Sequence, residues 1–259
     1  MNPALPAHWG IRPVLFSVGR LDIPSYGVFM ALAVAAGLLV YYREASRQRT
    51  LSENTFYILM AGLVGGALGA KLPILALNWH EIVSEHGWNL LVSGRSIVGG
   101  LVGGAVSVML LKRTLRINER KGNLFAPAIA LGMVIGRIGC FLRGCCFGAP
   151  TTLPWGTDFG DGVPRHPTQL YEALFMLGMF GFLTALKSKA PRPGALFRIL
   201  MLGYFSFRFA IEFIRVEGGA FLGLTFFQWI SLVVLAWYAK DWFWKPDPDP
   251  QAGPVVMKG

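Results

Sequence analysis

Long apolar stretches separated by short polar segments dominate the hydropathy pattern of this chain. A bilayer core about 30 Å thick is crossed by about 20 mostly apolar residues of helix. By that length the sequence predicts seven spans, at 24–42, 55–78, 97–111, 124–142, 168–186, 195–214 and 225–244. We therefore expect an all-α fold, a polytopic integral membrane helix bundle with seven transmembrane helices.

The ends of the chain differ from the spans in composition. We expect residues 1–245 to form one transmembrane domain. Residues 246–259 begin with alternating proline and aspartate and have little to bury, so they are expected to form a flexible cytoplasmic tail.

The composition supports a membrane protein and excludes several soluble classes. Apolar residues make up 54% of the chain and charged residues only 15%, whereas soluble domains carry about 25% charge. Disorder and nucleic-acid binding by a basic soluble domain are therefore poor interpretations, and we expect no nucleic-acid partner. Three cysteines, two of them adjacent, also do not make the disulfide framework of a small secreted protein.

The distribution of Lys and Arg predicts the orientation. The loops after spans one, three and five and the segment after the last span, together with the span ends beside them, hold fifteen of these residues, and the opposite side holds six. Because positive loops are retained in the cytoplasm, the N-terminus should lie outside and the C-terminus in the cytoplasm. Most of the net charge of +10 is thus a topology signal rather than a ligand site.

The three remaining cations lie further inside the predicted spans. Lys71, Arg137 and Arg208 would each cost about 2.5–3.5 kcal/mol at a helix centre, so such residues normally face a polar cavity. Glu172 and Glu212 are also within spans and could pair with them. A transport path, a lipid-headgroup site and a structural ion pair all fit this pattern.

Glycines cluster in the second and third spans. Close helix packing through small residues is one interpretation, and a cavity lined by bare backbone is the other. The clusters are Gly62, Gly65, Gly66 and Gly69, then Gly99, Gly100, Gly103 and Gly104.

The densest polar stretch lies at the outer end of the fourth span, residues 136–148. Arg137 and Arg143 stand there among glycines, and the planar arginine side chain binds phosphate through two hydrogen bonds. A phosphate headgroup is one natural ligand. Alternatively, Arg143 extends to the membrane surface and Arg137 pairs with Glu172 or Glu212.

Two further stretches carry candidate chemistry. His166 stands at the outer entrance to the fifth span, where it could be a structural residue or a base. Arg208, Glu212 and Arg215 are spaced to share one helix face. That stripe could guide an anionic headgroup or could bridge two helices.

The cysteines do not fit a metal site. Cys140, Cys145 and Cys146 with His166 offer four possible ligands, but their spacing matches none of the usual zinc patterns. We therefore expect no metal, and we expect the cysteines to be small packing residues. An exposed thiol on the oxidising side is the other interpretation.

At these residues the chain resembles the prolipoprotein diacylglyceryl transferase family of bacterial inner-membrane enzymes. The resemblance covers nearly the whole chain, and the ordered set of motifs is more specific than any single one. They are Tyr26-Gly27, the glycines ending near Lys71, Ser96 with Gly99-Gly100, Gly136-Arg137-x-Gly139, His166 to Glu172, and Arg208 to Arg215.

The resemblance implies a multi-pass enzyme of the bacterial cytoplasmic (inner) membrane that uses no cofactor. Its partners would be membrane lipid, namely phosphatidylglycerol, and the signal-peptide lipobox of a preprolipoprotein. The diacylglyceryl group would pass to the lipobox cysteine thiol, leaving glycerol 1-phosphate. The implied catalytic residues are Tyr26, Arg137, His166, Arg208 and Glu212, and the implied lipid-binding residues are Arg137, Arg208, Gly99, Gly100 and Arg143.

Three positions depart from the family's pattern. Val98 stands where the family usually has a histidine proposed as a base, Cys140 replaces an asparagine, and Cys145 replaces an acidic residue. The thiol of the substrate needs deprotonation, so His166, Glu212 or solvent would have to help. The alternative function is a family-like membrane protein that binds an anionic phospholipid or a lipoprotein without the chemistry.

Overall fold

The structure is a computed structural model that describes residues 9–77, 96–189, 192–215 and 220–244. The segment expected to form a tail, residues 246–259, lies outside the described residues. The chain divides into two compact units, Met1–Glu44 with Lys121–Gly259, and Ala45–Arg120. The single domain expected over residues 1–245 stays a prediction.

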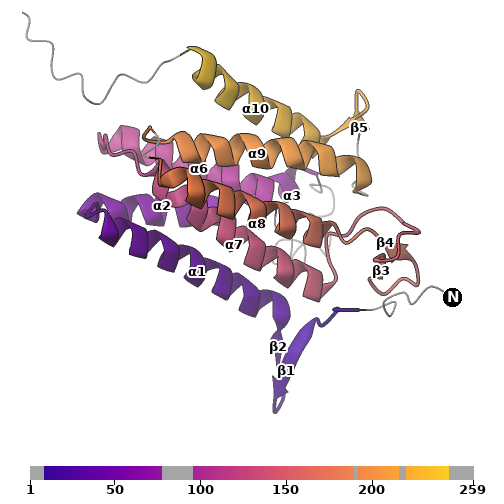
Figure 1. Ribbon diagram of the computed structural model, residues 1–259. Coiled ribbons are helices and arrows are strands. Elements are labelled where there is room, and N and C mark those ends of the chain that lie inside the picture. Colours follow the sequence, from indigo (N-terminus) through magenta and orange to yellow (C-terminus); the bar gives the residue numbers. More distant parts are fainter. Residues whose placement is uncertain (1–8, 78–95, 190–191, 216–219, 245–259) are drawn as a thin grey trace, which may run out of the picture. The chain divides into compact units, whose positions relative to one another are not determined.

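The first unit is built mainly of five helices (Figure 1). They are α1 (Ser25–Arg47, of which the last three residues belong to the second unit), α7 (Gly122–Arg143), α8 (Thr168–Lys187), α9 (Ala195–Ile211) and α10 (Phe226–Trp244). One short antiparallel strand pair precedes α1, β1 (Val14–Val18) with β2 (Leu21–Pro24). Two more lie between later helices, β3 (Thr157–Asp158) with β4 (Pro164–Arg165) and β5 (Ala220–Phe221) with β6 (Leu224–Thr225).

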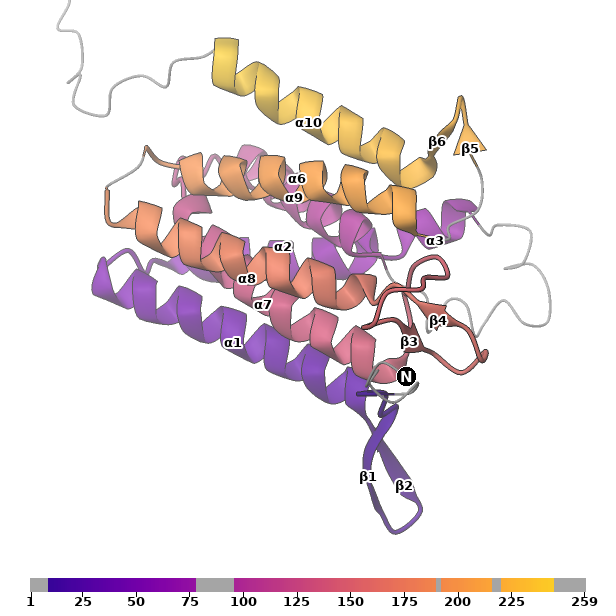
Figure 2. The ribbon, with the colours of Figure 1, turned by 45° about the vertical axis from the view of Figure 1, so that its right-hand side comes forward.

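Helix α7 forms the core of this unit. In the most apolar 18-residue stretch of α7, 61% of the residues are buried, whereas the corresponding stretches of α1 and α8 are 17% and 28% buried. Helices α8 and α9 pack on α7 and on each other, and α10 packs on α9 (Figure 2). Bare glycines let α1 approach α7, because a methyl group at Gly139 would lie only 2.6 Å from Cβ of Phe29. The centre of the unit is therefore the helix that carries Arg137.

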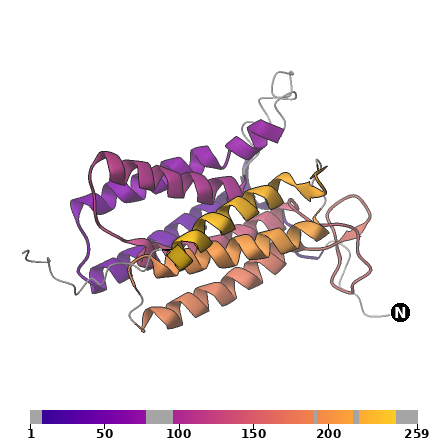
Figure 3. The same ribbon diagram turned by 90° about the horizontal axis from the view of Figure 1, so that it is seen from above.

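The second unit consists of α2 (Glu53–Gly69), α3 (Leu72–Leu77) and α6 (Ile97–Thr114). Helices α2 and α6 lie side by side (Figure 3). A methyl group at Gly69 would lie 2.5 Å from the carbonyl oxygen of Gly99, and one at Gly103 would lie 2.5 Å from that of Gly65. The prediction of close packing through glycines is confirmed. Lys71 stands at the break between α2 and α3.

Helices occupy all seven ranges predicted as spans. Within the described residues, five helical segments are long and apolar enough to cross a membrane: α1, α2 continued by α3 (Glu53–Leu77), α6, α7 and α8. Helix α9 has 17 residues, and residues Phe226–Lys240 of α10 form a shorter apolar helix. A predominantly helical membrane protein is thus confirmed, while seven crossings and the orientation of the termini stay predictions.

Candidate active site

Arg137 lies on the buried face of α7 and pairs with a carboxylate of α8. Its Nη2 atom is 2.5 Å from Oε2 of Glu172, and the two side chains are 6% and 1% exposed. The other carboxylate oxygen, Oε1, accepts a hydrogen bond of 3.2 Å from the hydroxyl of Tyr204 on α9. Glu172 therefore joins three helices at one point. Of the two partners that the sequence left open for Arg137, the structure selects Glu172.

A second buried pair forms where α9 ends. Arg208 Nη1 lies 2.8 Å from Oε2 of Glu212, the first residue of the 3-10 turn Glu212–Ile214. Arg215 Nε approaches the same oxygen at 3.8 Å, and the Thr225 hydroxyl donates to Oε1 at 3.0 Å. The guanidinium of Arg208 also lies over the ring of Phe227, 5.0 Å from its centroid, in a cation–π contact. Both carboxylate oxygens of Glu212 are therefore engaged.

Tyr204 connects the two pairs. It stands four residues before Arg208 on α9, so the two side chains share one helix face. Its own side chain is fully buried and bonds to the partner of Arg137. The Arg137 pair and the Arg208 pair thus belong to one polar cluster in the apolar interior of the first unit.

This cluster is rich in arginine. Among the described residues it joins Arg137, Arg208 and Arg215 with the carboxylates of Glu172 and Glu212, and each of the five side chains is 7% exposed or less. The buried Nε of Arg137 has no hydrogen-bond partner in the described part of the chain. Because buried polar groups are nearly always satisfied, this N–H can donate to one further acceptor.

Next to the cluster, α7 ends in a cap whose geometry depends on Gly144. This residue has φ +75°, in the left-handed region that glycine adopts without strain. Its N–H donates to Phe141 O at 2.9 Å, and the N–H of Cys145 reaches back to Cys140 O at 3.2 Å. This is the Schellman pattern of helix termination.

The residues after the cap are held by the start of α8. Gln169 Nε2 donates to the carbonyl of Cys145 at 2.5 Å, and the Thr168 hydroxyl donates to that of Cys146 at 2.7 Å. Arg215 Nη1 donates to the same Cys146 carbonyl at 3.4 Å. The cap therefore contacts both α8 and the arginine that neighbours Glu212.

His166 stands on a backbone strip beside this cap. Gly148 donates its N–H to His166 O at 2.9 Å and forms an antiparallel bridge with Arg215. The Nδ1 atom of His166 is 3.2 Å from the hydroxyl of Tyr171, which also accepts from Trp155 Nε1 at 2.7 Å. The imidazole is thus oriented through Nδ1.

Tyr26 and Arg143 are brought together at the same end of the bundle. The Arg143 guanidinium lies 5.2 Å from the ring centroid of Tyr26, across the start of α1 and the end of α7. Arg143 is exposed, whereas Tyr26 is half-buried.

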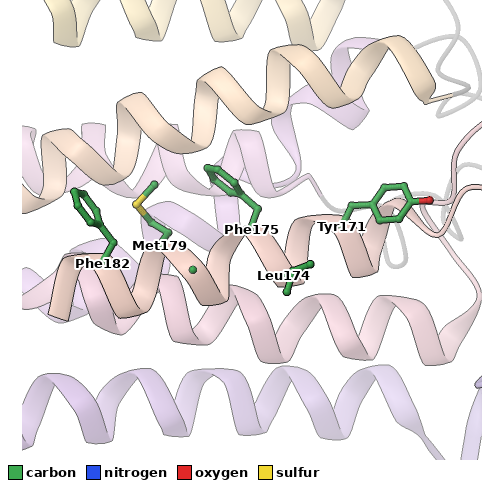
Figure 4. A pocket seen from close by; sticks show the side chains of 6 residues that line it. Tyr171, Leu174, Phe175, Met179 and Phe182 are labelled. Atoms are coloured by element: carbon green, nitrogen blue, oxygen red, sulfur yellow. The ribbon is translucent and has the colours of Figure 1, made fainter. Parts of the chain in front are cut away.

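An apolar groove of about 520 Å³ runs along α8 from this end. Figure 4 shows Phe175, Met179 and Phe182 pointing from α8 toward α9, with Tyr171 at one end of the row. Phe175 stacks on Phe207 of α9 at 4.4 Å between centroids. The groove therefore begins one residue from Glu172 and offers apolar surface along the helix.

Comparisons with known proteins agree with these features. The model of the prolipoprotein diacylglyceryl transferase family matches residues 13–244. The chain belongs to this family. It is 32% identical over 234 residues to the phosphatidylglycerol–prolipoprotein diacylglyceryl transferase of Clostridium tetani, covering 87% of this chain and 94% of that protein. Enzymes of the same name from Bordetella parapertussis and Cupriavidus pinatubonensis are each 35% identical, covering 87% and 88% of this chain and 92% and 89% of theirs.

The departures of this transferase from the family's pattern fall in two places. Cys140 and Cys145 are the residues that the cap of α7 joins by a backbone hydrogen bond. Val98 belongs to the second unit, where it is buried at the start of α6. Gly99 and Gly100 follow it and face α2, so the structure uses their missing side chains for helix packing. Their role in lipid binding stays a prediction.

Two residues that contact Glu172 and Glu212 are not predicted from the sequence, namely Tyr204 and Thr225. Tyr204 lies four residues before Arg208, a spacing that could have drawn attention to it. Thr225 follows Glu212 by thirteen residues and lies on a different element, so no local pattern points to their hydrogen bond.

Proposed function

We propose that this protein transfers the diacylglyceryl group of phosphatidylglycerol to the thiol of a lipobox cysteine in a preprolipoprotein. Its membership of the transferase family and the names of its relatives support this assignment. The geometric observation that carries it is the buried Nε of Arg137, which has no hydrogen-bond partner among the described residues and belongs to the guanidinium that pairs with Glu172. A phosphate oxygen of the headgroup can accept a hydrogen bond from that N–H.

Arg137 and Arg208 are the proposed phosphate-binding residues. In the reaction a bond forms between the thiol sulfur and the glycerol carbon of the lipid, and the bond from that carbon to the phosphate oxygen breaks. The phosphate departs on glycerol 1-phosphate with an additional negative charge. Guanidinium groups already fixed in an apolar interior stabilise charge where it develops. Glu172 and Glu212 then act as positioning residues that hold the two guanidinium groups.

His166 is the proposed acceptor of the thiol proton. Glu212 is a poorer choice because its oxygens already face Arg208, Arg215 and Thr225. When Nδ1–H of His166 donates to Tyr171, the Nε2 atom presents its lone pair to the substrate. Loss of the thiol proton makes the sulfur nucleophilic.

Tyr26 and Arg143 are proposed to bind the polar part of the substrates. The exposed guanidinium of Arg143 rests on the Tyr26 ring at the end of the bundle nearest the cap. An exposed arginine there can contact a lipid headgroup before the phosphate reaches Arg137. The groove along α8 offers apolar surface of the kind that an acyl chain covers.

The proposed setting is the bacterial cytoplasmic (inner) membrane. With seven crossings and the N-terminus outside, the cap of α7, His166 and Arg215 lie toward the outer face. That face is where the lipobox of a secreted precursor arrives. No cofactor takes part in the proposed reaction.

The decisive test is complementation of a conditional strain lacking its own transferase, followed by mass measurement of a lipobox reporter. We expect the reporter to gain the mass of one diacylglyceryl group. Arg137→Ala and Arg208→Ala should each abolish the gain while membrane insertion stays normal. Wild-type turnover in either variant would overturn the assignment of the phosphate site.

The departures at Val98, Cys140 and Cys145 favour a second candidate, a protein of this family that binds anionic lipid without transferring it. An assay of the purified protein in nanodiscs that contain phosphatidylglycerol distinguishes the two candidate functions. Release of glycerol 1-phosphate in the presence of a lipobox peptide supports the transferase. Saturable lipid binding that depends on Arg137, with no release, supports the second candidate.

A further inference from the structure

Three thiols meet at the cap of α7. In the Schellman pattern the side chain three residues before the helix end contacts the second residue beyond it. These positions hold Cys140 and Cys145. Cys145 Sγ lies 3.5 Å from the carbonyl oxygen of Cys140, and all three cysteines are free thiols.

Cys146 is the third cysteine at the cap, and its residue is more exposed than the buried Cys140. It is half-buried, and its backbone stands at φ +67°. The thiols of Cys140 and Cys145 are close enough to influence its ionisation. Hydrogen bonding to these two thiols, followed by the charges of Arg137 and Arg215, holds the pKa of Cys146 well below its usual value. In contrast, hydrogen bonds to Cys140 and Cys146 raise the pKa of Cys145.

Disulfide geometry favours one of the three pairs. A disulfide needs Cβ atoms about 3.5–4.5 Å apart, and the cap makes Cys140 and Cys145 neighbours, since both the N–H and the Sγ of Cys145 approach the carbonyl oxygen of Cys140. Adjacent cysteines such as Cys145 and Cys146 can close only a small ring that distorts the peptide between them. The carbonyls of both residues are fixed by Gln169, Thr168 and Arg215, which opposes such a distortion.

We propose that Cys140 and Cys145 form an intramolecular disulfide by exchange with an external small-molecule or protein disulfide, and that Cys146 is the thiol through which the exchange enters. The Cys146 thiolate attacks the external disulfide, forms a mixed disulfide and releases one thiolate. Cys140 then attacks the Cys146 sulfur and releases the second external thiolate. Finally Cys145 attacks the Cys140 sulfur and returns Cys146 as a thiol. The external disulfide is thereby reduced to two thiols, and two cysteines of this chain are oxidised.

This modification site is separate from the proposed transferase reaction, which consumes no oxidant. It needs only thiols in contact, one of them reactive and half-exposed, and those are present at the cap. Under the proposed topology the cap lies toward the side of the membrane where disulfides persist. The test below uses protein in detergent, so its result depends neither on topology nor on transferase activity.

The test starts from full-length protein that has been reduced and then incubated with oxidised glutathione. After acid quenching, free thiols are alkylated and the protein is analysed by intact mass and by peptide mapping. We expect one alkylated cysteine, Cys146, and a Cys140–Cys145 cross-link without glutathione. Three alkylated cysteines, or a cross-link between Cys145 and Cys146, would overturn the proposal.

Two serine variants test the entry thiol. Cys146→Ser should form the same cross-link about tenfold more slowly. In this variant the exchange would have to start at Cys145, whose thiol is less ionised. Cys140→Ser should stop at a stable glutathione adduct on Cys146. An unchanged rate in the first variant, or no adduct in the second, would contradict the assigned role of Cys146. Equal elution volumes and melting temperatures of the reduced proteins show that the variants are folded.

Discussion

Tyr204 donates a hydrogen bond to the oxygen of Glu172 that Arg137 leaves unused. The contact runs from α9 to α8, and the Arg137 contact runs from α7 to α8. Because Tyr204 also precedes Arg208 by one helical turn, the position of one guanidinium is tied to that of the other. Two arginines that are proposed to bind one phosphate need such coupling, since catalysis depends on charges held in place before the reaction starts.

Glu172→Gln and Tyr204→Phe should lower the free energy of unfolding by different amounts, because they remove different kinds of contact. Removing the carboxylate leaves Arg137 buried without its counter-charge, which costs about 3–5 kcal/mol in buried pairs. Removing the phenol hydroxyl loses one hydrogen bond worth about 1 kcal/mol. Thermal unfolding in detergent measures the difference. Equal losses for the two variants would mean that the pair contributes no more than the hydrogen bond.

His166→Gln tests the proposed proton acceptor. The imidazole is proposed to take the thiol proton as the sulfur attacks, so its removal should slow the transfer. The variant should lose about 10²-fold in rate while membrane insertion stays normal, as expected for removal of a general base. Mass measurement of the lipobox reporter over time gives the rate. A wild-type rate in the variant would reduce His166 to a structural residue held by Tyr171.

Parts of this architecture are predictable because their signals are local. Apolar runs of membrane-spanning length identify the seven helical ranges, and spacing along one helix predicts that Arg208, Glu212 and Arg215 share a face. The structure confirms the helical ranges. Both arginines do approach Glu212, but α9 ends at Ile211 and Arg215 is extended, so the prediction of one continuous helix face is wrong. The glycine clusters likewise predict the approach of α2 to α6, although their other interpretation, a lined cavity, has the same sequence pattern.

The remaining contacts depend on how separate helices face one another. The sequence places Glu172 and Glu212 equally well for pairing with Arg137, and only the packing of α7 on α8 selects Glu172. The hydrogen bond from Thr225 to Glu212 depends on the turn between α9 and α10. The contact of three thiols depends on the cap at Gly144, whose left-handed conformation no hydropathy pattern predicts.

Met179→Trp should obstruct the groove along α8. The larger side chain would project among Phe175 and Phe182, where the acyl chain is proposed to lie. We expect a higher KM for long-chain phosphatidylglycerol and little change with a short-chain analogue. Leu177→Trp is the matched control, since Leu177 is half-exposed on the same helix but does not line the groove. The same KM increase in both variants would exclude a specific role for the groove.

Gly139→Ala should separate α1 from α7, because the added methyl group would lie 2.6 Å from Cβ of Phe29 and neither backbone can yield without disturbing the core. Overpacking of this kind typically costs about 1–3 kcal/mol. Gly181→Ala on α8 is the control: its methyl group would meet no described atom within 4 Å, and alanine favours a helix over glycine by about 0.5–1 kcal/mol. The first variant should therefore melt at a lower temperature than the wild type and the second at an equal or higher one. Since Gly139 stands two residues after Arg137, the first variant should also lose activity below its melting temperature. Full activity with an unchanged melting temperature would show that α1 is not packed against the helix that carries Arg137.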